Sequence, residues 1–405
     1  MRSASRRSTG AARLVLGIVL LGATLAGCAR TPGAAPPAGG AADAGAGAPL
    51  AAPAAKPAGR AAGQPGGAPG AAADYFAGKT VTVLVNFSAG GPTDIFARMV
   101  AQFLDKHIPG RPKVIVENKA GAGGVIGANQ LYRVARKDGL TVGMFSSPFA
   151  SQVIQGEGVQ YDSAGFIWLA GVNESQVSYA SSSLGVRSAR DLAQAREEIV
   201  VGGLSPDNSK DMAMRTFLNM MGVPYKYVTG YPGQADVVLA FRRGEVNYAE
   251  DSLTSYAATV VPMIREGQVV PMGQRGIVKN GQFVRDPRVP DVPTFFETAT
   301  EMKGESVKQT VDYRAMALLV ELGTMLRAIV YPPGTDPMLV EAMQQAMADT
   351  FADPELQATA EKQLGFQFEF VPAAEAQALA QKIVNSASDD PDALEYLRRQ
   401  AGEAR

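Results

Sequence analysis

The sequence predicts an α/β fold, because strand-like and helix-like segments alternate between residues 74 and 390. Two segments carry this prediction. Val81–Phe87 and Val114–Glu117 are short apolar runs that each end in a glycine-rich turn, and a helix-like run follows each turn. In such a unit, the backbone N–H groups of the turn and the positive end of the helix face the crevice above the strands. We therefore expect the chain to hold a small anion there.

The N-terminal region before residue 74 lacks the pattern of a folded domain. Arginines precede the apolar run 14–21, which is too short to span a bilayer core of ~30 Å, and a Leu-Ala-Gly-Cys sequence ends at Cys28. Residues 1–28 resemble a bacterial lipoprotein signal peptide with Cys28 as the lipidated residue, and a soluble export signal is the alternative. Residues 29–73 are almost entirely Ala, Gly and Pro, which predicts a disordered tether.

The first half of the folded region predicts three strands. After the first strand, Gly91 is suited to cap a helix that begins at Pro92. The second strand leads into a helix over about 124–136, and a third strand at 140–145 ends in two serines. This order places three strand ends and two helix starts in one α/β domain.

The second half repeats the plan with shorter segments, and its last strand leads into Glu250 and Asp251. The C-terminal third is rich in helical patterns. The expected elements are strands at 199–203, 225–228 and 246–249, a helix at 235–243, and C-terminal helices at 316–329, 337–351, 354–365 and 373–386.

Composition and motifs exclude several classes of function. A formal net charge of −1 provides no basic surface for nucleic acid. One cysteine and one histidine cannot form an internal disulfide or a zinc cluster, so we expect no metal site. The segment Gly121–Gly127 lacks the dinucleotide fingerprint, because Ile126 stands where a glycine or alanine is needed. We therefore expect no cofactor.

Four short motifs occur along the folded region: FSAGGPTD at 87–94, ENKAGAGGVIG at 117–127, PDVPT at 290–294 and PGTDP at 333–337. In composition and order they resemble the motifs of the substrate-binding receptors of tripartite tricarboxylate transporters, a family of periplasmic two-lobed binding proteins. The resemblance covers about 78–385.

This resemblance implies a two-lobed periplasmic binding protein fold, type II-like, in which two α/β sheet domains are joined by hinge crossovers. We expect the crossovers near 170–180 and 264–272. The expected parts are lobe 1 at 74–175 and 268–390, lobe 2 at 176–267 and a C-terminal tail at 391–405.

The resemblance also implies where a ligand is held. In the family the ligand lies between the lobes, and a carboxylate can be bound there by several N–H and O–H donors without a bidentate arginine. The matching ligand-binding positions in this chain are Ser88, Ala89, Gly90, Gly91, Thr93, Asp94, Ser146, Ser147, Asn208, Ser209 and Asp251.

Three departures from the family pattern change the second lobe. Asp211 stands where histidine is frequent, Glu250 stands where an apolar residue is frequent, and the turn Gly230–Gly233 lacks the lysine found there in the family. Two extra carboxylates and one missing cation make the lobe less suited to a tricarboxylate. Each of the two acids either faces the cleft or is a solvated surface acid. The segment 297–331 is also longer than the resemblance implies.

The predicted function is that of a non-catalytic receptor, monomeric and lipid-anchored in the periplasm through Cys28. It would capture a small carboxylate by hinge closure and deliver it to membrane transporter subunits. One alternative is a receptor that presents its closed form to a signalling partner. Another is an exported hydrolase that uses Asp94, Glu250 and Asp251, but the chain lacks a nucleophile–base pair.

Overall fold

The computed structural model describes residues 70–146, 148–279 and 282–402. The chain divides into two units, 1–63 and 64–405, and the described residues belong to the second. The predicted signal peptide with Cys28 lies outside the described residues, as do Ser147 and the tether as far as residue 69. The end of the predicted tether is helical, because helix α1 begins at Ala71.

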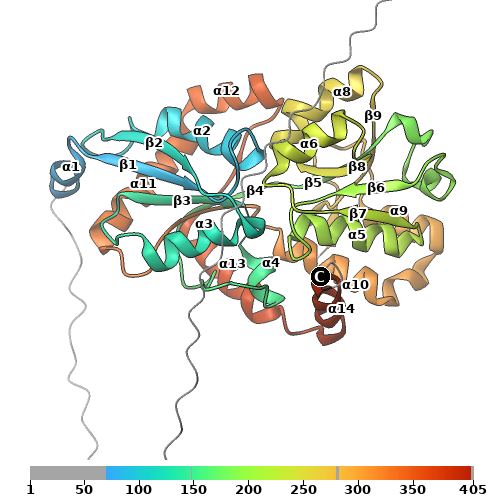
Figure 1. The fold of residues 1–405 in the computed structure, drawn as a ribbon. Helices are drawn as coiled ribbons and strands as arrows, with labels where there is room; N and C mark the ends of the chain where they lie inside the picture. Colours follow the sequence, from blue (N-terminus) through green and yellow to red (C-terminus); the bar gives the residue numbers. More distant parts are fainter. Residues whose placement is uncertain (1–69, 147, 280–281, 403–405) are drawn as a thin grey trace, which may run out of the picture. The chain divides into compact units, whose positions relative to one another are not determined.

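The described residues form two mixed sheets, one in each lobe (Figure 1). The first has the strand order β13-β4-β12-β3-β1-β2, in which β1 pairs parallel with β2 and β3, while β12 pairs antiparallel with β3 and β4. Its strands are β1 (Thr80–Val85), β2 (Lys113–Asn118), β3 (Thr141–Ser146), β4 (Ile167–Asn173), β12 (Arg327–Tyr331) and β13 (Glu369–Pro372).

The second sheet has the order β7-β6-β8-β5-β9, with β6 parallel to β7 and β8 and with β5 antiparallel to β8 and β9. A separate hairpin pairs β10 with β11. The strands are β5 (Gln176–Ser181), β6 (Ile199–Gly202), β7 (Tyr225–Val228), β8 (Tyr248–Ser252), β9 (Val269–Gln274), β10 (Ile277–Lys279) and β11 (Gln282–Val284).

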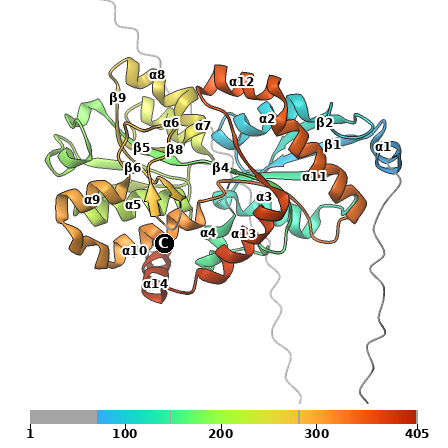
Figure 2. The ribbon, with the colours of Figure 1, turned by 180° about the vertical axis from the view of Figure 1, so that it is seen from behind.

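Helices cover both sheets, as the front and back views show (Figures 1 and 2). Such cover explains why β1 alternates little at its end and buries the consecutive residues Val83, Leu84 and Val85. The helices are α1 (Ala71–Phe76), α2 (Pro92–Leu104), α3 (Val125–Asn129), α4 (Phe149–Val153), α5 (Ser209–Met221), α6 (Gln234–Arg242), α7 (Leu253–Ser255), α8 (Val261–Arg265), α9 (Phe295–Lys303), α10 (Val311–Leu322), α11 (Pro337–Ala352), α12 (Pro354–Leu364), α13 (Ala373–Ser386) and α14 (Pro391–Gly402).

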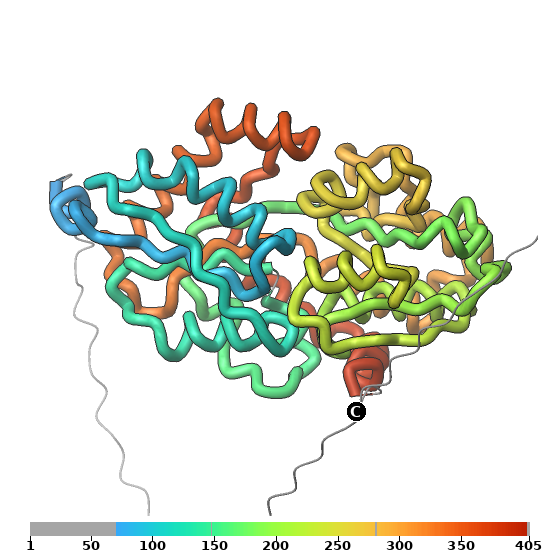
Figure 3. The backbone as a smooth tube through the Cα atoms, turned by 45° about the horizontal axis from the view of Figure 1, so that its top comes forward, coloured from blue at the N-terminus to red at the C-terminus, as the bar shows by residue number. Residues whose placement is uncertain are grey.

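The chain crosses between the lobes first where β4 leads into β5 and again between α10 and β12 (Figure 3). The first crossover lies within the expected range 170–180. The expected second crossover at 264–272 does not match the structure, because β9 at Val269–Gln274 pairs with β5 inside the second sheet. Helices α9 and α10 then pack against α5, so the second lobe continues well past residue 267.

Two C-terminal predictions are wrong. The expected helix at 316–329 ends at Leu322, and Arg327–Tyr331 forms strand β12 between β3 and β4. A run of β-branched and aromatic residues at this position favours a strand. The expected tail at 391–405 contains helix α14, which packs against α10 and α5 and buries Leu394 and Leu397.

Candidate functional site

A cavity of about 650 Å³ lies between the two sheets, where the lobes meet. Residues from both lobes line it: from the first, Phe87, Pro92, Thr93, Gly123, Ser146, Ala150, Ser151, Leu326 and Arg327, and from the second, Gln176, Leu204, Asn208, Ser209, Lys210, Gln234, Asp251 and Ser252. Such a mixed lining, with a few polar groups among apolar ones, is typical of a small-molecule site.

The fold brings three helix starts to this cavity. Thr93 lies in the first turn of α2, Lys210 in the first turn of α5, and Gln234 is the first residue of α6. The caps of α2 and α6 are glycines, which provide no side chain to pair with the first backbone N–H groups. The positive ends of three helices therefore favour a negatively charged ligand.

Arg327 is buried at the beginning of β12, directly opposite Ser146 on β3. Its Nη1 donates to Thr93 Oγ1 at 3.1 Å, and its Nη2 donates to Ser252 Oγ at 2.6 Å. Nη2 also lies 2.9 Å from Glu174 Oε2 in the crossover segment, while Nε has no hydrogen-bond partner. Arg327 thus links the first sheet to the second and keeps one unpaired donor in a residue that lines the cavity.

The second lobe contributes two acceptors without partners. Asp251 Oδ2 accepts from Tyr179 Oη at 2.8 Å, but its Oδ1 accepts no hydrogen bond. Gln234 Nε2 donates to the carbonyl oxygen of Glu250 at 3.0 Å, which leaves Oε1 without a partner. Burial raises the pKa of Asp251 to about 6, although the nearby charge of Lys210 and the hydrogen bond from Tyr179 favour the ionised form.

Lys210 is a second cation at the cavity. Burial lowers the pKa of its ammonium group, while the acidic residues Asp211, Asp251 and Glu250 act in the opposite direction. As a cationic residue in the lining, Lys210 favours an anionic ligand.

The predicted ligand-binding residues fall into two groups. Thr93, Ser146, Asn208, Ser209 and Asp251 line the cavity together, although they come from four separate segments of two lobes. Ser88, Ala89, Gly90, Gly91 and Asp94 are not part of its lining.

The turn at 88–91 contacts the second lobe instead. A Cβ atom placed on Gly233, at the start of α6, would lie 1.8 Å from Ser88 Oγ, and one on Gly91 would lie 3.9 Å from Gln234 Cβ. A second contact between the lobes joins Asn208 Nδ2 to the carbonyl oxygen of Gly123 at 3.4 Å. These loops therefore close over the cavity.

Asp94 stabilises the same turn from inside. Its carboxylate accepts hydrogen bonds from Gly90 N at 2.9 Å, Arg98 Nε at 2.8 Å and Asn118 Nδ2 at 2.9 Å. Burial opposes ionisation, but the three hydrogen bonds outweigh it and lower the pKa of Asp94. Asn118 also donates to the carbonyl oxygen of Phe87, so this network holds the two glycine-rich turns together.

The two unexpected acids of the second lobe are both fully buried, which excludes the solvated alternative. Asp211 Oδ2 accepts from Leu204 N at 2.5 Å, Ser205 N at 3.0 Å and Tyr227 Oη at 2.8 Å. Glu250 pairs with Arg275 at 2.6 Å. Neither acid belongs to the lining of the cavity.

Sequence reasoning missed Arg327, Lys210 and Gln234. The helical pattern at 316–329 predicts a helix at Arg327, whereas the break at Gly323 and the run Ala328–Tyr331 are signals for a strand. Lys210 follows two predicted residues directly, and its position in the first turn of α5 was the available signal.

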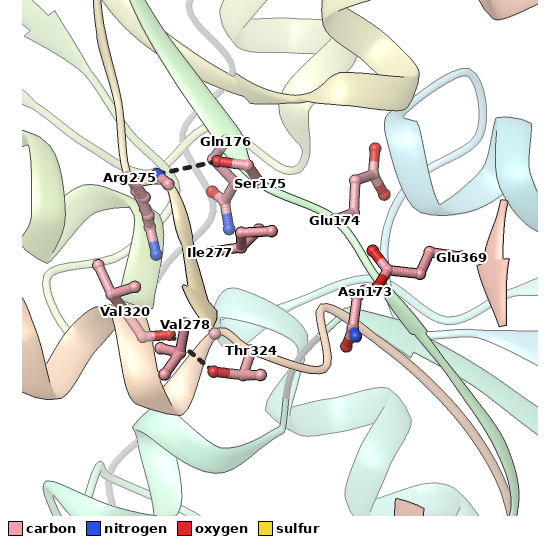
Figure 4. Close-up of a pocket in the computed structure, with 12 residues that line it drawn as sticks. Asn173, Glu174, Ser175, Gln176, Arg275, Ile277, Val278, Val320, Thr324 and Glu369 are labelled. Carbon is pink, nitrogen blue, oxygen red and sulfur yellow. Dashed lines mark hydrogen bonds between the residues drawn. The ribbon is translucent and has the colours of Figure 1, made fainter. Parts of the chain in front are cut away.

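A second cavity of about 460 Å³ lies at the crossovers (Figure 4). Glu174 and Gln176 border it from the first crossover, Thr324 from the second, and Arg275 N donates to the carbonyl oxygen of Gln176 at 3.0 Å. Glu174 pairs with Arg327, and Arg275 Nη1 donates to Ser209 Oγ at 3.1 Å. Gln176 also lines the first cavity, so the two cavities adjoin at the first crossover.

The described part of the chain contains no group of three or more His, Cys, Asp or Glu residues that could hold a metal ion. Within the same residues, no helix combines the length and apolar character needed to cross a membrane.

Comparison with known proteins identifies relatives over most of the folded region. The family model described as "Tripartite tricarboxylate transporter family receptor" matches residues 96–393. A protein of Cupriavidus necator described as "UPF0065 protein in gbd 5'region" is 26% identical over 281 residues, which cover 68% of this chain and 75% of that protein. Protein BugT of Bordetella pertussis is 41% identical over a shorter stretch of 76 residues, 19% of this chain and 22% of its own.

Solved structures share the fold. The periplasmic binding protein BugD superposes with a TM-score of 0.61 at 22% identity, covering 80% of this chain and 98% of its own. MatC from Rhodopseudomonas palustris with bound malate superposes with a TM-score of 0.59 at 21% identity, covering 77% and 98%. The predicted two-lobed binding protein fold is thereby confirmed.

The family model covers well over half of the chain, and its members are receptors. This agrees with the prediction that the protein is not an enzyme, and it confirms the resemblance first seen in four short motifs. The chain belongs to the family of tripartite tricarboxylate transporter receptors.

Proposed function

We propose that this protein is a periplasmic receptor that captures a small organic acid in the cavity between its lobes and delivers it to a tripartite membrane transporter. The observation that carries the proposal is the charge pattern of that cavity. Three helix starts, Lys210 and the unpaired Nε of Arg327 all favour a carboxylate.

Relatives of the same fold support this class of ligand. MatC from Rhodopseudomonas palustris is described with bound malate, and a second protein from R. palustris with adipate, at 20% identity and a TM-score of 0.58. Both ligands are small dicarboxylates.

We further propose that Thr93, Ser146, Asn208, Ser209 and Asp251 contact the ligand, with Lys210 and Arg327 as additional anchors. Their common position in the lining of one cavity supports this assignment. The turn at 88–91 and Asp94 contribute by shaping the entrance, because they contact the opposite lobe or stabilise the turn. Ser147 stays a proposal from the family pattern alone.

The test is a titration of the purified protein with a panel of mono-, di- and tricarboxylates, followed by calorimetry and by the shift of the unfolding temperature. We expect at least one small carboxylate to bind and to raise that temperature. Uncharged amides of the same acids serve as controls and should not bind. If no carboxylate binds, or if the amides bind equally well, the proposal fails.

Delivery and anchoring need separate experiments. Deleting the gene should abolish uptake of the radiolabelled ligand by cells, and the wild-type gene should restore it. A Cys28→Ser variant should lose membrane association if Cys28 carries a lipid anchor, and it should keep the ligand affinity of the wild type. A variant that stays with the membrane contradicts the anchor but not the receptor.

A further inference from the structure

The second lobe presents unpaired hydrogen-bond acceptors to the cavity. Asp251 is fully buried and Gln234 is 4% exposed, yet Asp251 Oδ1 and Gln234 Oε1 have no partner. Both residues line the cavity. Leaving a buried acceptor without a donor is unfavourable, and leaving a charged one without a donor is more so. A ligand that supplies donors to these two atoms removes this cost.

The first lobe presents the opposite character. Arg327 is 1% exposed, and its unpaired Nε is a donor, while Thr93 Oγ1 and Ser252 Oγ already accept from its other nitrogens. The lining is therefore complementary to a ligand that has a hydrogen-bond acceptor near Arg327 and a hydrogen-bond donor near Asp251 and Gln234. A plain dicarboxylate supplies only acceptors when both of its groups are ionised.

The charges around the cavity also favour a ligand that carries both a carboxylate and a hydrogen-bond donor. Arg327 is paired with Glu174, and Arg275 behind the cavity is paired with Glu250. Lys210 is then the cation available to a ligand carboxylate, and Asp251 is an unpaired acid in the same lining. A second negative group on the ligand near Asp251 would be repelled, whereas a hydroxyl or ammonium group there would donate to it.

We infer that the ligand is a small carboxylate that also carries a hydrogen-bond donor, a hydroxyl or an ammonium group, which Asp251 and Gln234 recognise in the second lobe. This inference rests on the proposed receptor function and narrows its substrate class. Asp251 and Gln234 thereby act as specificity-determining residues.

The test uses matched acids that differ only in the donor. Succinate, malate and aspartate share a four-carbon chain with no donor, a hydroxyl and an ammonium group, and glutarate, 2-hydroxyglutarate and glutamate form the five-carbon set. In calorimetric titrations of the full-length protein, we expect a donor-bearing acid to bind at least about tenfold more tightly than its unsubstituted partner, which corresponds to about 1.4 kcal/mol. The hydroxy and amino arms identify which donor is recognised.

The variant Asp251→Asn tests whether Asp251 recognises the hydrogen-bond donor of the ligand. It keeps the volume and the contact with Tyr179, but it turns an amide N–H toward the unpaired position, so the tenfold preference should fall below about threefold. Asp236→Asn is the matched control, since it makes the same charge change on α6 outside the lining and should retain the preference. The unfolding temperature of each variant shows whether it is folded.

Three results would decide against the inference. Equal binding of unsubstituted and donor-bearing acids overturns it but leaves the receptor function intact. Retention of the preference in folded Asp251→Asn protein removes Asp251 from the recognition of the donor and overturns it likewise. Failure of every acid to bind contradicts the receptor function itself.

Discussion

Arg327 Nη2 lies 2.6 Å from Ser252 Oγ, and this hydrogen bond joins β12 of the first sheet to the end of β8 in the second. The same nitrogen pairs with Glu174 in the crossover, and Glu174 Oε1 in turn accepts from the backbone N–H of Thr254. One guanidinium group therefore connects both lobes and the segment between them, directly at the wall of the cavity.

This network predicts a strong coupling between Arg327 and Glu174. Arg327→Met leaves a buried carboxylate without its cation, and we expect a loss of about 3–5 kcal/mol in the free energy of unfolding. Adding Glu174→Gln should restore part of that loss, because the uncompensated charge is gone. Denaturant unfolding of both single variants and the double variant measures the coupling.

The exposed pair of Arg190 and Glu301 provides the control for that experiment. Their side chains are 55% and 57% exposed, so Arg190→Met should change stability by no more than about 1 kcal/mol. Simple additivity of the Arg327 and Glu174 substitutions would contradict the buried network.

The close approach of Gly233 to Ser88 predicts that a side chain added at Gly233 keeps the two lobes apart. Its backbone is extended, with φ of −167°, so alanine is tolerated there in itself, but the new Cβ would meet Ser88 Oγ at 1.8 Å and Ser88 Cβ at 2.9 Å. We expect Gly233→Ala to weaken ligand binding at least about tenfold. Small-angle X-ray scattering should also show a larger radius of gyration than that of the liganded wild type.

Gly91→Ala is the control for the closure experiment. Gly91 is also extended, with φ of −81°, and its added Cβ would come no closer than 3.4 Å to another atom. Binding should change little in this variant. If Gly233→Ala closes and binds like the wild type, contact between the loops does not limit closure.

Asp251 predicts a pH dependence of stability in the ligand-free protein. Its pKa is raised to about 6 by burial, so folding favours the protonated form, and this contribution is present at low pH and is lost as the pH rises through 6. The groups that act on it are Lys210 on α5, Tyr179 on β5, Gln234 on α6 and Ser255 on α7.

The difference between Asp251→Asn and wild-type protein isolates this effect from other titrating groups. Because the pKa of Asp251 is about 6 in the folded protein, the stability of the variant relative to the wild type should rise by about 2–3 kcal/mol between pH 4 and pH 7. Urea unfolding at several pH values measures it. If the difference in stability does not vary with pH, the pKa of Asp251 is not raised by folding.

The hydrogen bonds of Asp94 predict that replacing this residue destabilises the folded protein, whether or not the residue contacts the ligand. Asp94→Asn weakens three hydrogen bonds that hold the turn, and we expect a loss of about 2 kcal/mol in the free energy of unfolding. Folding lowers the pKa of Asp94, so its carboxylate stabilises the folded protein at pH values above the ordinary pKa of an aspartate. This stabilisation is lost as the pH falls below that value. Asp105→Asn at the exposed end of the same helix should change stability by less than about 0.5 kcal/mol. Unchanged stability with lost binding would instead make Asp94 a direct ligand contact.

Local pattern was enough to predict most elements of the fold. Apolar runs that end in glycines predicted β1 and β2 with the helices behind them, because strand and helix periods and glycine turns are properties of neighbouring residues. The prediction failed at β12, because helical periodicity alone does not register the break at Gly323, which ends the helix before the strand-forming run Ala328–Tyr331.

The sequence by itself therefore determined the α/β class, the glycine turns and the family, since each depends on short runs of residues. Only the tertiary structure decided which polar groups meet. Arg327 reaches Ser252 across 75 residues of chain, and Asp251 and Glu250, which are adjacent in sequence, face opposite sides of β8 and have different partners. A strand directs neighbouring side chains to opposite faces, and the partners of each face come from distant segments, so their pairing is a property of packing.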